Sequence, residues 1–168
     1  MRSDEALICA VARGDRTAFH ELYQRHAERV YRFARSLVWN GPLAEEVLQE
    51  TMLAVWKQAG RFRGNSKLST WILGIARNQA HALQRREARG ARTPDIAGVE
   101  PDPSETVEIG VRVQRALRQL SAEHREALHL VFFDELSVAD AAAVLGVPEG
   151  TLKSRLFYAR KALSKELR

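Results

Sequence analysis

The stretch Val144–Leu163, VLGVPEGTLKSRLFYARKAL, decides how the carboxyl end of this chain folds. Gly146 and Pro148 interrupt one helical pattern, and a second helical pattern begins immediately after them. At about 3.6 residues per turn, one side of the second helix gathers the apolar residues Leu152, Leu156, Ala159 and Leu163. The three alanines at 141–143 let two helices cross closely, so the stretch predicts a helix-turn-helix.

The outward side of the second helix is suited to DNA. No acid interrupts the chain between Glu149 and Glu166. The second helix of this motif enters the major groove, where polar side chains reach phosphates and base edges. The outward residues are Gly150, Ser154, Phe157, Tyr158 and Lys161, flanked by Thr151, Lys153 and Arg155. A solvated amphipathic helix in a plain bundle is the alternative that periodicity alone leaves open.

Charge divides the chain into three parts. Residues 1–92 carry 16 Lys and Arg against 9 Asp and Glu, residues 93–110 carry 5 acids and no base, and residues 111–168 carry 10 bases against 7 acids. Residues 93–108 also hold three of the five prolines, so they predict a flexible acidic linker. Two basic blocks favour a polyanionic binding partner that both blocks contact, although many basic proteins bind no polyanion.

Both blocks have helical rather than strand periodicity, which predicts an all-α protein of two small helical domains. A short opening helix is expected after its N-cap Ser3, and Ser121 and Ser137 are placed as later N-caps, with Asp140 completing a capping box. A long helix with a face from Phe19 to Leu37 is expected to stop near Asn40-Gly41-Pro42. The other expected helices cover residues 43–59, 68–86, 108–119, 122–134, 138–145 and 149–166.

Composition argues against several classes of protein. Cys9 is the only cysteine, so no intramolecular disulfide is possible and a cytoplasmic protein is expected. The apolar neighbours of Cys9 predict a buried thiol. Because no stretch approaches the roughly 20 apolar residues of a membrane span, no membrane insertion is expected. The five histidines show no metal-ligand spacing and no nucleophile motif is present, so no metal, cofactor or enzymatic activity is expected.

The helix expected over residues 43–59 has two unlike sides. Its predicted buried arc consists of Leu43, Val47, Leu48, Thr51, Ala54 and Val55. Its other side holds Glu45, Glu46, Gln49, Glu50, Leu53 and Trp56. Large apolar side chains among carboxylates are typical of a protein docking patch with a basic partner. The alternative is that Leu53 and Trp56 pack under the N-terminal helix or against the linker.

The next loop and helix mix basic, amide, hydroxyl and aromatic groups. The stretch Gly60–Trp71 is GRFRGNSKLSTW, and the outward face of the following helix consists of Thr70, Gly74, Arg77, Asn78, His81 and Arg85. Aromatic rings beside basic side chains hold single strands, because every unstacked base offers a face for stacking. Asn and Ser in a loop can bind the edge of an extruded base. For Trp71, a stacking role and a core role fit the sequence equally well.

Two blocks, AEEVLQETMLAVWKQAGRFRGNSKLSTWILGIARNQAHALQRR and LSVADAAAVLGVPEGTLKSRLFYARKAL, together resemble the extracytoplasmic-function (ECF) sigma factors of bacterial RNA polymerase. The resemblance implies a sigma region 2-like domain over 1–92, a linker over 93–108 and a sigma region 4-like domain over 109–168. It implies a sigma factor that binds core RNA polymerase, directs it to specific promoters and promotes DNA melting. Exposed binding surfaces also favour restraint by an anti-sigma factor, on which the sequence is silent.

The resemblance assigns roles to particular positions. It implies that the polymerase's largest-subunit coiled coil is bound by Glu45, Glu46, Gln49, Glu50, Leu53 and Trp56, where family members commonly have Asp in place of Glu45 or Glu46. It implies that the minus-ten element is bound as a single strand by Phe62, Arg63, Asn65, Ser66, Lys67, Thr70, Trp71, Arg77, Asn78, His81 and Arg85. It implies that the minus-thirty-five duplex is bound by Ser137, Glu149, Gly150, Thr151, Lys153, Ser154, Arg155, Tyr158 and Lys161. Phe132 and Phe133 could either pack in the core or help bind this domain to the polymerase flap, and both alternatives are left open.

The main rival is a free-standing helix-turn-helix regulator. Such a protein would bind closed duplex DNA without polymerase, and its N-terminal domain would bind a ligand or dimerise. That interpretation leaves the acidic docking side and the strand-binding loop unexplained, so a promoter-directing sigma factor is the favoured hypothesis.

Overall fold

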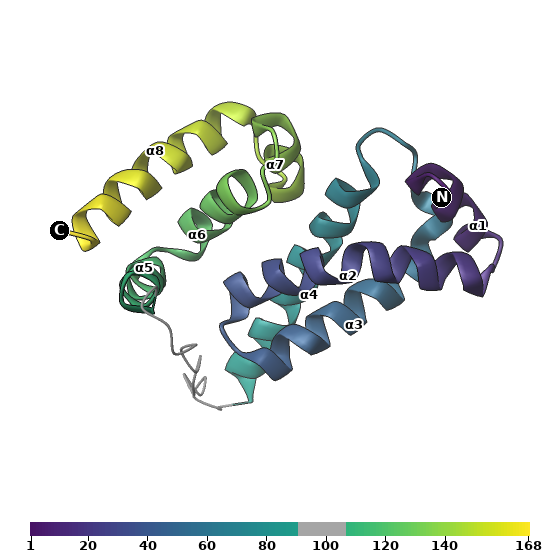
Figure 1. The fold of residues 1–168 in the computed structure, drawn as a ribbon, viewed down its shortest axis with the longest axis horizontal. Helices are drawn as coiled ribbons and strands as arrows, with labels where there is room; N and C mark the ends of the chain where they lie inside the picture. Colours follow the sequence, from purple (N-terminus) through teal and green to yellow (C-terminus); the bar gives the residue numbers. More distant parts are fainter. Residues whose placement is uncertain (91–106) are drawn as a thin grey trace. The chain divides into compact units, whose positions relative to one another are not determined.

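The structure, a computed structural model, describes residues 1–90 and 107–168, and the regular elements in these ranges are all helical (Figure 1). They are α1 (Asp4–Ala12), α2 (Arg16–Val38), α3 (Gly41–Gln58), the 3-10 turn η1 (Ala59–Arg61), α4 (Leu68–Arg89), α5 (Val107–Gln119), α6 (Ala122–Leu128), the π-helix η2 (His129–Phe133), α7 (Val138–Leu145) and α8 (Glu149–Glu166). The predicted all-α class is confirmed. The helices form two compact units, α1–α4 and α5–α8. The predicted linker lies outside the described residues except for its last two, with which α5 begins.

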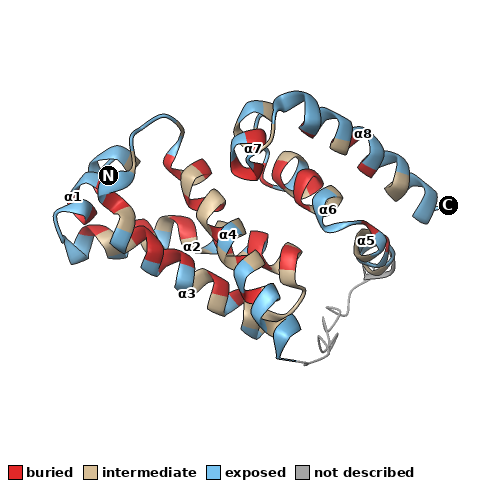
Figure 2. Ribbon diagram, turned by 180° about the vertical axis from the view of Figure 1, so that it is seen from behind, coloured by how far each residue is buried: buried red, intermediate tan, exposed pale blue. Residues whose placement is uncertain are grey.

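In the first unit, α2 packs against α1, α3 and α4. The first three helices are capped by the side chains of Ser3, Asp15 and Asn40, each of which accepts a hydrogen bond from a backbone N–H three residues later. The buried stripes of these helices face one another (Figure 2) and form a core that includes Leu22, Val30, Phe33, Val47, Ile72 and Leu73. Full burial of each such side chain contributes about 1.5–3 kcal/mol, which holds the unit together.

Several burial predictions for this unit are wrong. Cys9 is exposed, because the buried side of α1 is made by its neighbours Leu7, Ile8, Ala10 and Val11. An apolar stretch in a helix that packs on one side still has a solvent side. In α3, Ala44 and Met52 are buried, whereas Leu43 and Leu48 are only half-buried. The buried arc of α3 is therefore rotated toward Ala44 relative to the predicted one.

In the second unit, α8 packs against α5, α6 and α7. Ser121 and Ser137 cap α6 and α7 as predicted. Gly146 ends α7 with a φ of 65°, a left-handed conformation that favours glycine. The chain turns at this residue and α8 begins soon after it. The first helix, the turn and the second helix therefore lie where the stretch Val144–Leu163 predicts them.

The expected single helix over residues 122–134 is interrupted. The chain forms α6 and then the π-helix η2, where the Asp134 N–H donates a hydrogen bond of 3.0 Å to the carbonyl of His129, five residues earlier. The buried Asp134 carboxylate also lies 3.3 Å from His129 Nε2. A turn widened by one residue leaves no mark in apolar spacing of period 3.6, so the sequence could not predict it.

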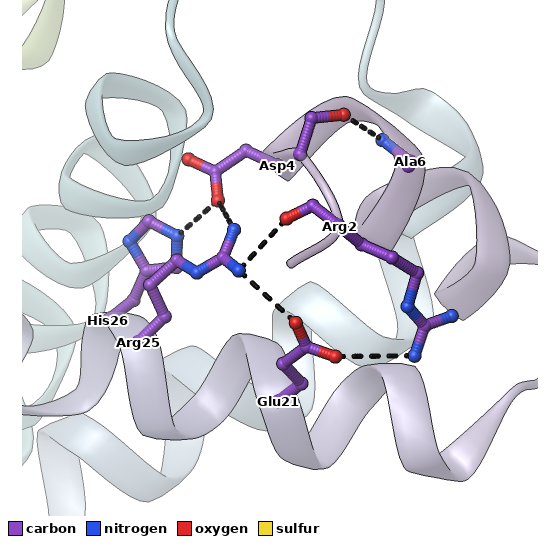
Figure 3. A network of polar contacts seen from close by, with 7 residues as sticks. Arg2, Asp4, Ala6, Glu21, Arg25 and His26 are labelled. Atoms are coloured by element: carbon purple, nitrogen blue, oxygen red, sulfur yellow. Dashed lines mark hydrogen bonds and ion pairs between the residues drawn. The ribbon is translucent and has the colours of Figure 1, made fainter.

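A polar network fastens α1 to α2 (Figure 3). Arg25 donates from Nη1 to Asp4 Oδ1 at 2.8 Å, and from Nη2 to the Arg2 carbonyl at 2.9 Å and to Glu21 Oε1 at 3.2 Å. His26 Nε2 lies 3.2 Å from the same Asp4 oxygen. One guanidinium on α2 thus binds Asp4 of α1, the backbone just before α1 and Glu21 of α2, which fixes the start of α1 on the middle of α2.

This network makes the stability of the first unit depend on pH. Burial lowers the pKa of His26 from 6.5, and the Asp4 contact offsets only part of that shift. Burial alone would raise the pKa of Asp4 above 3.8, but the Arg25 hydrogen bond and the neighbouring positive charges make the net shift downward. Just below pH 6.5, His26 therefore takes up a proton more readily in the unfolded chain than in the folded chain. Below pH 3.8 the same holds for Asp4.

We therefore expect the free energy of unfolding of the first unit to fall as the pH drops from 6.5 through the lower folded pKa of His26, and again below 3.8. The variant His26→Gln should lose the first decline and keep the second. Urea unfolding of both proteins at about pH 7.5 and about pH 5.5 would measure this difference. An unchanged pH dependence in His26→Gln would contradict the assignment.

Candidate protein and nucleic-acid interfaces

The acidic side of α3 is exposed around one apolar side chain. Glu45, Gln49 and Glu50 are exposed, and Leu53, about one turn after Gln49 and Glu50, keeps 45% of its surface accessible. Glu46 is held by an ion pair with Arg86 of α4, and its hydrogen bond raises the pKa of Arg86. We call Glu45, Glu46, Gln49, Glu50, Leu53 and Trp56 the docking face; it remains acidic, with Leu53 as its accessible apolar centre.

The sequence left open whether Trp56 is a docking residue or packs against another part of the chain, and the structure shows both packing and accessibility. Its ring is half-buried and meets Phe19 of α2 edge-on, with ring centres 5.3 Å apart and planes at 75°. The indole therefore packs against α2 while part of it stays accessible beside Leu53. Trp56 supports the docking face, and substitutions of it would also disturb the α2–α3 packing.

The loop between η1 and α4 carries an aromatic pair beside exposed polar groups. Phe62 and Trp71 are both half-buried, with ring centres 5.4 Å apart. Exposed residues surround the pair, namely Arg63, Gly64, Asn65 and Lys67, and Gly64 adopts a left-handed φ of 74°. Trp71 is neither fully buried nor fully exposed, because its ring packs on Phe62 while part of the indole remains accessible.

One residue predicted on the outward face of α4 lies inside. Thr70 is 3% exposed, and its hydroxyl has no hydrogen-bond partner among the described residues. The buried residues of α4 also include Leu73 and Ala80, and Thr70 lies on the same buried side. Asn78 and Arg85 are exposed as expected, and Arg77 and His81 are half-buried. Thr70 is removed from the candidate DNA contacts.

The outward side of α8 is accessible. Its exposed side chains include Thr151, Lys153, Ser154 and Lys161. Tyr158 and Phe157 are 57% and 62% exposed, with ring centres 5.3 Å apart at nearly a right angle. Ser137, by contrast, uses its hydroxyl to cap α7 by accepting from the Asp140 N–H at 3.0 Å. The helix therefore presents hydroxyl, ammonium and aromatic groups, and its own sequence carries no acid between Glu149 and Glu166.

Arg155 lies on the side of α8 that faces α6. Its side chain is 19% exposed, and Nη2 lies 3.6 Å from the Glu123 carboxylate of α6. Nη1 is buried without a hydrogen-bond partner among the described residues. The sequence placed Arg155 on the flank of the DNA side but missed Glu123, because a contact between separate helices has no signature in the spacing of either one.

Two family comparisons and one relative decide what the chain is. The Sigma-70 region 2 family matches residues 22–90, and the Sigma-70 region 4 family matches residues 110–163. The ECF RNA polymerase sigma factor SigM of Mycobacterium tuberculosis strain H37Rv is 39% identical over 168 residues, which cover 99% of this chain and 85% of SigM. The chain belongs to the ECF sigma factor family. Sigma factors are transcription initiation factors, so this membership decides against a free-standing regulator.

Solved structures agree with the fold of this sigma factor. RpoE from Bartonella quintana, crystallised with the anti-sigma factor NepR, matches with a TM-score of 0.77 and 29% identity, over 89% of this chain and 96% of RpoE. CnrH, solved in complex with the cytosolic domain of CnrY, matches with a TM-score of 0.76 and 26% identity, over 98% of this chain and 96% of CnrH. Both neighbours were solved with a bound protein partner.

The sigma factor also exposes an aromatic patch that the sequence left undecided. Phe132 and Phe133 of η2 are 48% and 64% exposed, so core packing is wrong for both. Arg160 of α8 places its guanidinium carbon 4.6 Å from the centre of the Phe132 ring, and the Phe133 ring stacks on His129. Arg160 was missed by sequence reasoning, because nothing in the spacing of α8 shows that the π-helix lies beside it.

Two negative findings apply to the described parts of the sigma factor. Within residues 1–90 and 107–168, no group of three or more His, Cys, Asp or Glu side chains could hold a metal ion. No helix in these ranges is long and apolar enough to cross a membrane.

Proposed function

We propose that this sigma factor binds core RNA polymerase through the docking face and then engages one promoter at two places. The domain roles are a region 2-like unit over residues 1–92, a linker over 93–108 and a region 4-like unit over 109–168. It acts in the cytoplasm and catalyses no reaction itself. The observation that supports this most is the exposed Leu53 among carboxylates in a unit that matches sigma region 2.

The docking face suits a basic protein surface. Three exposed polar or acidic side chains and the paired Glu46 share the outward side of α3 with Leu53, so an approaching partner meets negative charge before it buries apolar area. Charge of this kind steers encounter, whereas the buried apolar centre supplies most of the binding free energy. The proposed partner surface is the coiled coil of the polymerase's largest subunit. The exposed pair Phe132 and Phe133 suits a second, apolar contact with the polymerase flap.

The loop from Phe62 to Lys67 and the outward face of α4 are proposed to hold the minus-ten element as a single strand. Unstacking a base costs a few kcal/mol per step, and stacking on an aromatic ring returns roughly 1–3 kcal/mol per base. Asn65 is exposed in the loop that carries Phe62 of the half-buried Phe62–Trp71 pair, and Asn78 and Arg85 are exposed further along α4. Binding of unpaired bases then favours the melted promoter without any catalytic step.

The downstream-element role of the loop can be tested by exchange. Replacing residues 64–67, GNSK, by the loop of another ECF sigma factor is expected to change the preferred minus-ten sequence and leave the preferred minus-thirty-five sequence unchanged. Selection of active promoters from a randomised library would measure both preferences. Unchanged minus-ten preference would remove the reading role of this loop.

The second unit is proposed to bind the minus-thirty-five element as duplex DNA through α8. We expect Arg155→Ala to reduce the use of a matched element by about 1–3 kcal/mol while mismatched elements change less, as for a side chain that supports base recognition. Lys153→Ala is the comparison. Removal of an exposed Lys that contacts phosphate is expected to weaken the binding of all DNA sequences evenly and to lower the salt dependence of binding by about 1 in slope. A uniform loss in Arg155→Ala would instead make Arg155 a phosphate contact.

An anti-sigma factor is a further proposed partner. The structural neighbour RpoE is described in complex with the anti-sigma factor NepR. The present chain exposes the docking face, the aromatic patch and the DNA side of α8 in its free form. These are the surfaces that a regulator would have to cover in order to keep the sigma factor from the polymerase.

Transcription in vitro tests the whole proposal. Purified bacterial core polymerase would be supplied with a randomised promoter library, with and without this chain. We expect transcripts with defined start sites only when the chain is present. Failure to bind the polymerase, together with tight binding of a closed operator by the chain alone, would overturn the proposal.

A further inference from the structure

A cavity of about 420 Å³ lies between α1 and the segment that leads into the strand-binding loop. We propose that it holds one unstacked nucleotide of the opened promoter strand, next to the base captured by the loop. The proposal rests on the single-strand role proposed above and adds α1 to that role. The residues that matter most for it are Glu5, Cys9 and Arg13 of α1 and Gly60, Phe62 and Arg63 of the facing segment.

The interior of the cavity suits the face of a nucleobase. Ile8 and Ala59 line it and are 2% and 4% exposed, so they form an apolar floor. The half-buried Phe62 adds an aromatic ring at the boundary between cavity and loop. Its volume lies within the range of about 300–1,000 Å³ that is typical of small-molecule sites. A single base with its sugar therefore fits, whereas paired duplex does not.

The rim of the cavity suits the charged and polar parts of a nucleotide. Arg13 and Arg63 are exposed and form no ion pair within the described residues, so both are available to a phosphate. Glu5 is exposed on the same rim and accepts hydrogen bonds but cannot donate them when ionised. A carboxylate pairs with an exocyclic amine, so Glu5 favours cytosine, adenine or guanine over thymine.

The α1 wall is preformed. The Arg25–Asp4 contact of 2.8 Å and the Arg25 contact with the Arg2 carbonyl hold the start of α1 on α2 (Figure 3). Because this wall is already ordered in the free protein, a ligand does not have to order it. Phe62 and Arg63 belong both to the cavity and to the loop, so a strand bound by the loop continues directly past the cavity. This continuity favours a nucleotide within a strand over a free anion.

Alkylation of Cys9 tests the proposal without relying on transcription. Cys9 is the only cysteine, is exposed and lines the cavity. Holoenzyme would be treated with iodoacetamide in the absence of DNA, with a duplex that lacks a promoter, and with a promoter that carries an unpaired nontemplate strand. The Cys9 peptide would then be quantified by mass spectrometry. If a nucleotide fills the cavity about nine-tenths of the time, the unpaired promoter slows the reaction about tenfold.

The position of the nucleotide is tested by removing bases. We expect an abasic substitution at the nucleotide next to the captured base to restore alkylation, while abasic sites elsewhere in the unpaired strand do not. Equal protection by the duplex that lacks a promoter, protection that no abasic site relieves, or protection by inorganic phosphate alone would overturn the nucleotide site. If the holoenzyme transcribes and Cys9 stays unprotected, the further inference fails and the proposed function stands. If the holoenzyme does not open promoters at all, both fail.

Glu5→Gln allows a second test, which measures base preference and does not require alkylation of Cys9. We expect it to reduce the preference for an amino-bearing base over thymine at the restoring position by about five- to tenfold, because the amide also donates hydrogen bonds. Glu28→Gln, an exposed acid on α2 outside the cavity, is the control and should leave that preference unchanged. An unaltered base preference in Glu5→Gln would overturn the role of Glu5.

Discussion

Glu50→Lys combined with Leu53→Ala is expected to weaken the binding of core RNA polymerase on the order of 100-fold, or about 3 kcal/mol. Leu53 is the exposed large apolar residue of the docking face, with 45% of its surface accessible, and its truncation removes apolar area that an interface would bury. Reversal of the Glu50 charge places a like charge before the basic partner surface and slows association. Both residues are accessible, so the folded state should keep its stability.

Binding of fluorescently labelled chain to purified core polymerase would measure the loss. Glu28→Lys reverses an exposed charge on α2 and breaks only a surface contact of 4.0 Å with Arg32, so it serves as the matched control. Thermal unfolding of each variant checks that the fold is intact. Polymerase affinity equal to that of the unmodified chain would show that the docking face is wrongly assigned. Trp56→Ala is a poorer test, since it also removes the contact with Phe19.

Leu152→Ala is expected to destabilise the second unit by about 2–5 kcal/mol and to abolish minus-thirty-five recognition. Leu152 is 0% exposed in α8, so the shorter side chain leaves a cavity between α8 and its neighbours. A helical unit of this size has a total stability of only about 3–9 kcal/mol, at roughly 0.05–0.15 kcal/mol per residue. The loss is therefore comparable to the whole stability of the unit.

Calorimetry should show that only the transition of the second unit moves in Leu152→Ala, because the two units have separate cores. Leu152→Met keeps the volume and should cost less than about 1.5 kcal/mol. Lys153→Ala, at an exposed neighbouring position, should leave the unfolding transition in place while lowering DNA affinity. A shift of both transitions in Leu152→Ala would contradict independent units.

Local signals in the sequence were sufficient for most helices and for the position of the turn before α8. Ser3, Ser121 and Ser137 cap the helices that they were predicted to cap, because N-capping depends on one side chain and a backbone N–H three residues later. Gly146 ends α7 for a similarly local reason, its left-handed φ. The exposed acids of α3 and the acid-free run of α8 were also predicted, since charge on an amphipathic helix stays on its solvent side.

The candidate sites needed contacts between helices that no single segment encodes. Arg155 meets Glu123 of α6, Arg160 covers Phe132 of η2, and Glu46 pairs with Arg86 of α4. These partners are far apart in the sequence, and their approach depends on how whole helices pack. A cavity shared by α1 and the loop before α4 arises in the same way, so a prediction from periodicity could not have found it.

The sequence by itself determined the all-α class, the caps, the turn at Gly146 and the residues that carry the resemblance to ECF sigma factors, because these depend on neighbours within about one helical turn. Only the tertiary structure decided that Thr70 is buried and Cys9 exposed, and that Phe132 and Phe133 face solvent. The physical reason is that the width of a buried arc depends on how many helices pack against it and at what angle. Periodicity fixes the direction of such an arc only approximately and its width not at all.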